Sequence, residues 1–309
     1  MKKYFVFTLL MSIFMVGSAF AGDTTTIVVA DDSSSGTYKK MLGEIIGVCA
    51  NDSFNIIEAK GISGGAPANL DALVNNQAQA AFLHSDVFFA NSQADPTYKR
   101  FQTLIALYPE PIHVLALRES KTKKPGTFSF GVTNFNNLSD LRGFTVGAAG
   151  GGIYTARILK GQADAGFTVN HYGGGKEVIA ALDSGEIAAA IFVGAAPLPN
   201  IAQLDKSKYK LLPIDEAISS KVKGVYRSAT LNYPGLTAGP IQTVAPVATL
   251  LTRKFSTPMK VSAQRHLREC FYKHLDELKD SCSPNWQQVD ANDRGVLDWY
   301  EIPAISNKK

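Results

Sequence analysis

The sequence has few of the residues on which metal centres, redox sites and nucleic-acid interfaces depend. It contains three cysteines and five histidines in 309 residues, and the histidines are not spaced as metal ligands are. Its net charge of +4 is too small to indicate a nucleic-acid partner, and the basic segment 121–124 (KTKK) is typical of a solvated loop. We therefore expect no metal, no cofactor and no nucleic acid.

Long apolar runs are also rare, and the one at the amino terminus has the three parts of a secretory signal peptide. Residues 1–3 are basic at two positions, residues 4–16 are apolar, and residues 19–21 (AFA) form a small-x-small cleavage site. The apolar run is shorter than the roughly 20 residues that a membrane-spanning helix needs, although a membrane anchor is the alternative. We expect residues 1–21 to be removed after Ala21.

An exported chain can form a disulfide, and three cysteines leave one thiol over. Cys270 and Cys282 are nearest in sequence, but apolar residues at helical spacing from 267 to 278 predict a helix there. A continuous helix would separate these two cysteines by roughly 18 Å, whereas a disulfide needs Cα atoms within about 7 Å. Either the helix ends early or Cys49 is a partner, and the sequence leaves both open.

Two stretches of the sequence repeat one local pattern. Residues 62–86 and 171–194 each have a glycine pair, a helix-like stretch and a small-residue run into an apolar strand. Upstream, residues 36–42 (GTYKKML) resemble residues 152–159 (GIYTARIL). The pattern in each half of the sequence therefore predicts the same order of elements: a strand, a Gly-x-Tyr turn, a helix, a strand, a Gly-Gly turn, a helix and a strand. This order is typical of a parallel sheet with helices on both faces.

Two such sheets predict two lobes. The expected strands are residues 26–30, 54–59, 80–83, 144–148, 167–172 and 188–193. Ligand-binding turns lie at the carboxyl ends of parallel strands, and the distinctive glycine and hydroxyl clusters fall there. If the lobes face each other, these turns line one cleft. Residues 104–120 and 241–255 are β-rich stretches that can connect the lobes. We expect lobe 1 over 22–118, lobe 2 over 119–240, and a return crossover with carboxyl-terminal helices packed on lobe 1 over 241–309.

The order of the motifs resembles the TAXI family of solute-binding proteins, which serve tripartite ATP-independent periplasmic (TRAP) transporters. The matching segments are residues 36–38 (GTY), 63–65 (SGG), 69–70 (NL), 85–86 (SD), 108–111 (YPEP), 138–152 (LSDLRGFTVGAAGGG), 185–197 (GEIAAAIFVGAAP), 233–235 (YPG) and 241–251 (IQTVAPVATLL). The resemblance implies an α/β, two-lobed periplasmic-binding-protein fold (type II), with two crossover strands joining the lobes and a cleft between them.

The same resemblance implies a function. The expected protein is periplasmic, captures a small, carboxylate-bearing solute by hinge closure, and delivers it to the permease subunits of a membrane transporter. We expect a monomer. The sequence departs from the family pattern at Lys39-Lys40, where an aromatic residue and a proline usually follow Gly-Thr-Tyr, and at His84, where a glutamine often precedes Ser-Asp. Residues 285–303 have no counterpart in the pattern.

The candidate ligand-binding residues lie at the turns. Glycines before helices let backbone N–H groups approach an anion, with a plain turn capped by Ser35 or Thr37 as the alternative. Tyr38 and Tyr154 are equivalent in the two halves and either cover a ligand from both sides or pack on their own lobes. Arg157 is the cation expected to counter a carboxylate. The candidates are Ser34, Ser35, Gly36, Thr37, Tyr38, Ser63, Gly64, Gly65, His84, Ser85, Asp86, Gly151, Gly152, Tyr154, Thr155, Arg157 and Gly194.

The segment His84-Ser85-Asp86 has the letters of a catalytic triad but not its arrangement. A triad converges from separate segments, whereas adjacent side chains at a strand end point apart. We therefore predict that these three residues form a hydrogen-bonding wall and that the protein is not an enzyme. The alternatives are a solute receptor for an ATP-driven transporter or a sensor kinase and, less favoured, a periplasmic enzyme on the same scaffold.

Overall fold

The structure is a computed structural model that describes residues 24–31, 36–51, 53–123 and 132–304. The expected signal peptide and two candidate ligand residues, Ser34 and Ser35, lie outside these ranges. Within them, every helix is too short or too polar to span a bilayer.

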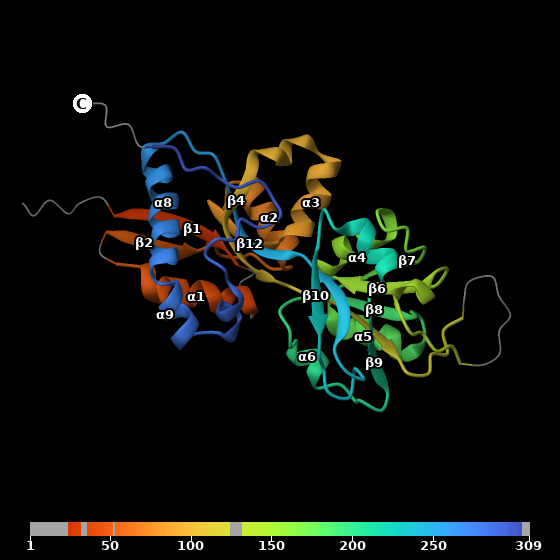
Figure 1. Cartoon of the computed structure of the whole chain (residues 1–309). Coiled ribbons are helices and arrows are strands. Elements are labelled where there is room, and N and C mark those ends of the chain that lie inside the picture. Colours follow the sequence, from red (N-terminus) through yellow and green to blue (C-terminus); the bar gives the residue numbers. More distant parts are fainter. Residues whose placement is uncertain (1–23, 32–35, 52, 124–131, 305–309) are drawn as a thin grey trace, which may run out of the picture.

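Lobe 1 is built on a five-stranded sheet with the strand order β2-β1-β3-β12-β4 (Figure 1). Three strands are parallel, namely β1 (Thr25–Ala30), β2 (Phe54–Glu58) and β3 (Ala80–His84). Between β3 and β4 (Phe101–Pro109) lies β12 (Val247–Arg253), which is antiparallel to both.

Lobe 2 repeats this plan in a second sheet with the order β7-β6-β8-β5-β9. Its parallel strands are β6 (Thr145–Ala149), β7 (Thr168–Tyr172) and β8 (Ala189–Val193). The antiparallel strand β5 (Ile112–Leu117) lies between β8 and β9 (Tyr209–Leu212). The repeat in the sequence therefore folds as a repeat of the sheet, and the six predicted strands form within a residue or two of their expected bounds.

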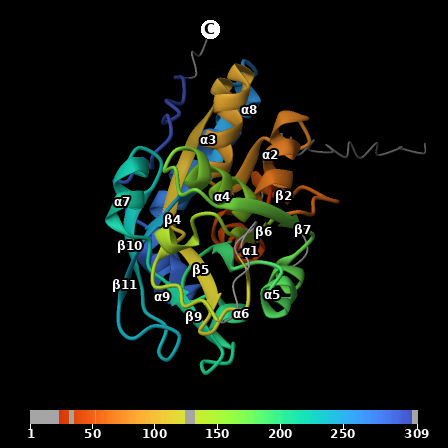
Figure 2. The ribbon, with the colours of Figure 1, turned by 90° about the vertical axis from the view of Figure 1, so that its right-hand side faces the viewer.

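Helices cover both faces of each sheet because alternate side chains of a strand point to opposite faces. In lobe 1 the helices and 3₁₀ turns are α1 (Thr37–Cys49), α2 (Ala66–Val74), α3 (Ser85–Ala94), η1 (Pro96–Arg100), α8 (Pro258–Lys273), α9 (Leu275–Ser281) and η4 (Pro284–Gln288). In lobe 2 they are η2 (Leu138–Leu141), α4 (Gly152–Gly161), α5 (Gly175–Ser184), α6 (Pro199–Ala202), α7 (Glu216–Ser219) and η3 (Ser220–Val222). Figure 2, seen from the lobe 2 side, shows α4 and α5 on this lobe.

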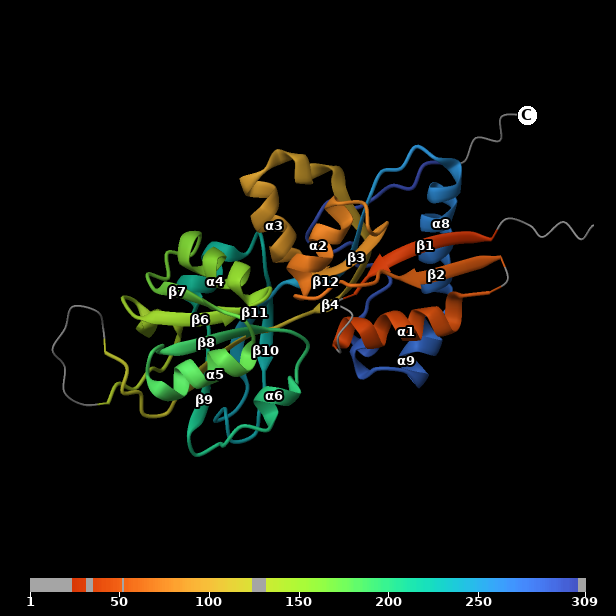
Figure 3. The same ribbon diagram turned by 180° about the vertical axis from the view of Figure 1, so that it is seen from behind.

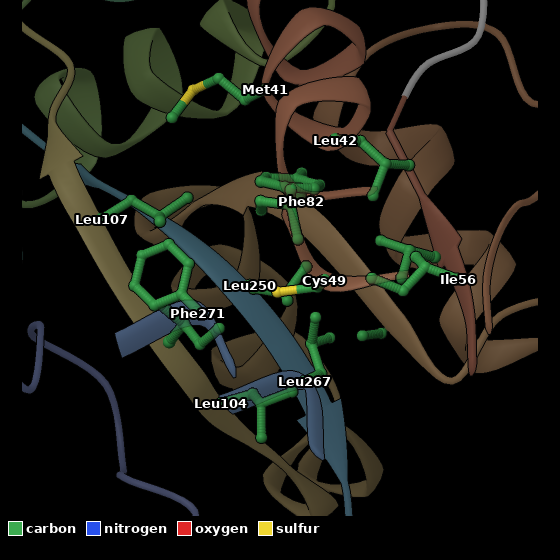
Figure 4. Close-up of a cluster of buried hydrophobic side chains, with 14 of the residues drawn as sticks. Met41, Leu42, Cys49, Ile56, Phe82, Leu104, Leu107, Leu250, Leu267 and Phe271 are labelled. Carbon is green, nitrogen blue, oxygen red and sulfur yellow. The ribbon is translucent and has the colours of Figure 1, made fainter. Parts of the chain in front are cut away.

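Each lobe has its own buried core. In lobe 1, Leu42 of α1, Leu267 of α8 and Phe82 of β3 belong to one cluster (Figure 4). The opposite face of the same sheet packs against α2 and α3 in a second cluster. Lobe 2 has a corresponding pair of clusters, one around α4 and one around α5.

The chain passes between the lobes twice, which confirms the predicted two-crossover fold. It leaves lobe 1 between β4 and β5, at residues 109–112, and returns between β11 (Ile241–Ala245) and β12, at residues 245–247. The first crossing precedes the boundary expected at residue 118, because β5 is already a strand of the second sheet. Before the return, β11 pairs with β10 (Arg227–Leu231) in an antiparallel hairpin.

The carboxyl-terminal segment covers an edge of lobe 1. Residues around Trp299 pair with the edge strand β4, because Thr103 N donates to Asp298 O at 2.7 Å and Tyr300 N donates to Thr103 O at 2.9 Å. This pairing protects an otherwise exposed strand edge. The same segment reaches lobe 2, where the guanidinium of Arg227 forms an ion pair with Asp293.

The structure shows both of the alternatives that the sequence left open. The helix expected over Cys270 and Cys282 ends early, and Cys49 is the disulfide partner of Cys270. Helix α8 ends at Lys273 and α9 begins at Leu275, so the helical stretch is interrupted at His274. Cys270 of α8 is bonded to Cys49 at the end of α1, with a Cα–Cα distance of 5.8 Å. Cys282 is the free thiol. The disulfide joins two helices that pack on the same face of the lobe 1 sheet.

We predict that this disulfide contributes substantially to stability because it closes a loop between residues 221 positions apart. Replacing both Cys49 and Cys270 with alanine should lower the free energy of unfolding by about 2–5 kcal/mol, measured by guanidinium unfolding without reductant. Cys282→Ala is the control and should change it by less than about 1 kcal/mol. Equal stability of the double variant and the wild type would contradict the pairing.

Candidate functional site

A cavity of about 350 Å³ lies between the two lobes. Lobe 1 lines it with Asp31, Gly36, Thr37, Tyr38, Gly65, Ala66, His84 and Glu110. Lobe 2 lines it with Ala149, Gly151, Gly152, Gly175, Phe192, Val193, Gly194, Leu198 and Asn200. These residues lie at the carboxyl ends of strands and at the starts of the following helices, on the side where α1 and α6 face each other (Figure 3). The two repeated halves thus present equivalent turns to one cavity.

Four of the helices that begin at this cavity begin after a glycine, whereas α3 and α6 begin after His84 and Leu198. The N-cap residues are Gly36 for α1, Gly65 for α2, Gly151 for α4 and Gly174 for α5, and none makes a side-chain cap. Glycine has no side chain with which to satisfy the unpaired N–H groups of a first helical turn. The cavity is therefore surrounded by the positive ends of four helix dipoles, two from each lobe, which favour an anionic group.

Asp86 lies behind the cavity and connects the lobes. Its carboxylate is fully buried and accepts hydrogen bonds from Thr155 Oγ1 of α4 at 2.6 Å and from the Tyr226 hydroxyl at 2.9 Å. It also forms an ion pair with His84 Nδ1. The other side of the His84 ring faces lobe 2, because a Cβ added at Gly151 would overlap His84 Nε2. His84 thus links the cavity to the interface between the lobes.

The charges of His84 and Asp86 stabilise each other against the cost of burial. Burial alone would lower the pKa of His84, but the charge and the hydrogen bond of Asp86 outweigh it and raise this pKa above its ordinary value of 6.5. Burial likewise acts to raise the pKa of Asp86, but His84, Thr155 and Tyr226 together lower it below its ordinary value of 3.8. Both side chains are therefore charged at any pH between the lowered pKa of Asp86 and the raised pKa of His84.

Tyr38 and Glu110 form a second polar pair, at the cavity wall. Tyr38 stacks on Phe82 with ring centroids 5.4 Å apart and donates a hydrogen bond to Glu110 Oε2 at 2.6 Å. Burial raises the pKa of Glu110 above its ordinary value of 4.5, although the charge of His84 and the bond from Tyr38 act in the opposite direction. Glu110 lies in the first crossover, so its carboxylate is placed where the two lobes meet.

The structure brings eight of the predicted site residues together at the cavity. They are Gly36, Thr37, Tyr38, Gly65, His84, Gly151, Gly152 and Gly194. Ser63 and Gly64 are exposed beside the cavity, where Gly64 lies close to Gly150 of lobe 2. Ser85, Asp86 and Thr155 are buried behind it, where the hydroxyl of Ser85 accepts a hydrogen bond from Val247 N at 3.0 Å.

Two predicted residues of α4 lie away from the cavity. Arg157 is exposed and stacks near Tyr154, with one guanidinium nitrogen 3.2 Å from His171 Nε2. It is more than a turn beyond the helix start that reaches the cavity, so it is not placed to counter a bound carboxylate. Tyr154 is not the counterpart of Tyr38 either, because it packs across the interface against the apolar cluster of α2 and α3 in lobe 1.

The list of predicted site residues lacked several that line the cavity. Asp31 directly follows strand β1, and the strand-end rule that selected the neighbouring hydroxyl residues would have included it. Glu110 lies within the segment YPEP, in the stretch 104–120 that the sequence predicts to connect the lobes. Phe192 and Asn200 had no sequence signal, since only the fold brings them close to Gly175 at the start of α5.

Comparisons with known proteins give one family match. The model of the family described as the NMT1-like family matches residues 30–283. No curated protein matches the chain in sequence.

Several solved structures are similar to this chain. An arginine transport system periplasmic binding protein from Legionella pneumophila is 12% identical with a TM-score of 0.46, covering 82% of this chain and 94% of that one. A TctC solute-binding protein from Polaromonas is 16% identical with a TM-score of 0.48, covering 89% and 90%. A periplasmic sulfonate-binding protein, SsuA, from Methylobacillus flagellatus KT is 8% identical with a TM-score of 0.49, covering 84% and 70%. The fold assignment rests on the strand orders and the two crossovers.

We predict that Asp86 sets the protonation of His84. In Asp86→Asn, the pKa of His84 should fall below its wild-type value, because burial, the largest effect on it, is then opposed only by the charge of Glu110. An NMR titration of the His84 ring measures this change. Thr155→Val is the matched control, since it removes one hydrogen bond to Asp86 and keeps the charge, so the pKa of His84 should stay raised. A pKa of His84 that is the same in Asp86→Asn and the wild type would contradict the coupling.

The same pair makes stability depend on pH. A raised histidine pKa stabilises the fold fully below pH 6.5, and this contribution is lost as the pH rises through the raised value. A lowered aspartate pKa stabilises it above pH 3.8, and this contribution is lost as the pH falls through the lowered value. The difference in unfolding free energy between the wild type and Asp86→Asn should therefore be largest between pH 3.8 and pH 6.5. It should shrink as the pH moves outside this range.

Proposed function

The chain belongs to the NMT1-like family, and from that premise we propose that it is a periplasmic solute-binding protein. It captures a small, carboxylate-bearing solute between its lobes and delivers it to the permease subunits of a membrane transporter. The observation that carries this proposal is the cavity itself, which is lined by equivalent turns from both lobes. The tripartite ATP-independent class of transporter, and the TAXI group of binding proteins, are proposed on the sequence resemblance alone.

The starts of the four helices support a carboxylate-bearing solute. Backbone N–H groups at helix starts that no side chain caps can bind an anion without a lysine or arginine, because the donors are already fixed in place. Glycine at these positions also lets the backbone approach the ligand closely. A solute bound here contacts helix starts from both lobes, so it favours the closed arrangement over the open one.

The two short crossovers support hinge closure. Rotation about residues 109–112 and 245–247 would separate lobes whose cores are distinct. The contacts that such a rotation would break include the hydrogen bonds of Asp86 to Thr155 and Tyr226. They also include apolar packing, because Tyr154 of lobe 2 contacts a cluster of lobe 1 and Phe89 of lobe 1 contacts a cluster of lobe 2. The solute therefore needs to shift an equilibrium between two arrangements of rigid lobes, not to reorganise either core.

The arrangement of residues 84–86 supports a binding role without catalysis. His84 Nδ1 is paired with Asp86, and its Nε2 faces the backbone of Gly151. The Ser85 hydroxyl is hydrogen-bonded to Val247 N and does not line the cavity. A base and a nucleophile are therefore not brought together on a bound solute by these residues.

We predict that the solute that copurifies with the protein compacts it. Small-angle X-ray scattering of solute-free protein should give a larger radius of gyration than the same protein after the solute is returned. In Gly151→Ala, the new Cβ would overlap His84 and keep the lobes apart, so compaction should be lost and affinity should fall at least about 10-fold.

The matched control is Gly161→Ala at the other end of α4, where an added Cβ meets nothing within 4 Å. It should compact as the wild type does. Unchanged dimensions in the wild type with a solute that demonstrably binds would refute hinge closure.

A further inference from the structure

The carboxyl-terminal segment beyond η4 lies outside the part of the chain that the family match covers. The NMT1-like family model ends at residue 283, and residues 285–303 have no counterpart in the TAXI pattern. We call residues 289–304 the strap. The structure describes the whole strap, which forms no helix and no strand of its own. Its contacts with both lobes are nevertheless specific.

Lobe 1 holds the strap at both ends. Val289 and Tyr300 are buried in the core cluster that α1 and α8 share. The ring of Trp299 lies near the guanidinium groups of Arg268 and Arg294, each 4.4 Å from its centroid, where cation–π attraction is favourable. Arg268 of α8 also donates a hydrogen bond to Tyr300 O at 2.6 Å. These anchors indicate that the strap moves with lobe 1.

The middle of the strap reaches lobe 2 through Asp293. Both oxygens of its carboxylate contact the guanidinium of Arg227, with Asp293 Oδ1 2.7 Å from Arg227 Nη2. Asp293 Oδ1 also accepts the N–H of Gly295 at 2.7 Å, and Gly295 has the left-handed φ of +76° that favours glycine. The Asp293 side chain is 15% exposed. A two-pronged pair with a carboxylate already held in place is stronger and more directional than a single contact.

Arg227 lies at the second crossover. It is the first residue of β10 and pairs in the ladder with Ala245, where β11 ends and the chain returns to lobe 1. The preceding residue, Tyr226, donates its hydrogen bond to Asp86 of α3. Two adjacent residues of lobe 2 are therefore bound to two different elements of lobe 1. A rotation that carries β10 away with lobe 2 separates Arg227 from Asp293, because the strap stays on lobe 1.

We propose that the strap is a latch between the lobes, in which the Arg227–Asp293 pair stabilises the closed arrangement even without solute. This inference rests on the hinge closure of the proposed function and adds a third connection to the two crossovers. Opening exchanges the pair for hydrated charges, so the pair lowers the fraction of molecules that are open. The latch therefore sets how often the cavity opens for a solute to enter or leave.

The test measures the closed and open populations of the solute-free chain. Spin labels on Asp71→Cys of α2 and Lys176→Cys of α5, in a Cys282→Ala background with the disulfide intact, report the distance between the lobes by double electron–electron resonance. Both labelled positions are exposed. Asp293→Asn and Arg227→Gln should each lower the ratio of closed to open molecules about fivefold. The double variant should fall no further, because either substitution alone already removes the pair.

The matched control is Asp290→Asn in the same strap. Asp290 carries the same charge, but it is exposed and accepts its hydrogen bond from Asn292 N within the strap. It should keep the ratio of the labelled parent chain. Salt gives a second signature, because Arg227 is 38% exposed and screening weakens such a pair. Molar sodium chloride should lower the closed fraction of the parent chain more than that of the double variant.

Several outcomes would overturn the latch. They are equal ratios in the parent chain and both folded single variants, a parent chain that is mostly open without solute, and a double variant that falls further or responds equally to salt. If circular dichroism shows that Asp293→Asn does not fold, Arg227→Gln decides the matter. A chain that binds no solute would end the proposed function but not the latch. One fixed distance in every variant would end hinge closure and the latch together.

Discussion

The structure depends on an exchange of strands between its two lobes. Each sheet contains one antiparallel strand that arrives from the other lobe, β12 in the first sheet and β5 in the second. Because these strands are inserted between strands of the receiving sheet, the two sheets are tied together at the two crossings. The tie brings the carboxyl ends of the parallel strands of both lobes to the same interface. The cavity and the helix starts that surround it both follow from this constraint.

Two buried carboxylates at this interface have opposite electrostatic surroundings. Asp86 is fully compensated, because His84, Thr155 and Tyr226 all contact it and its pKa is lowered despite burial. Within the part of the chain that the structure describes, Glu110 accepts its side-chain hydrogen bond from one neutral donor, Tyr38, and burial raises its pKa. Since a fully satisfied carboxylate has nothing left to offer a ligand, Asp86 is suited to joining the lobes. An incompletely compensated one is suited to recognition.

Most candidate residues at the glycine turns line the cavity, whereas Tyr154 and Arg157, which lie further inside α4, do not. The turn at the start of a helix lies at the cavity however the rest of that helix packs. Gly36 and Gly151 could therefore be found from the sequence pattern alone. The positions of Tyr154 and Arg157 depend on how far α4 extends and which face it turns toward α3. Helical periodicity gives the faces of a helix but not the neighbour that each face meets.

The sequence by itself determined the duplicated order of strands and helices, because hydrophobic periodicity and glycine turns are local properties of the chain. It also limited the disulfide to a few pairings. The tertiary structure alone decided that Cys49 meets Cys270, that Asp86 faces lobe 2, and that Asp31, Glu110 and Phe192 share one cavity. These are contacts between residues far apart in the chain, and their partners are set by the packing of the two sheets.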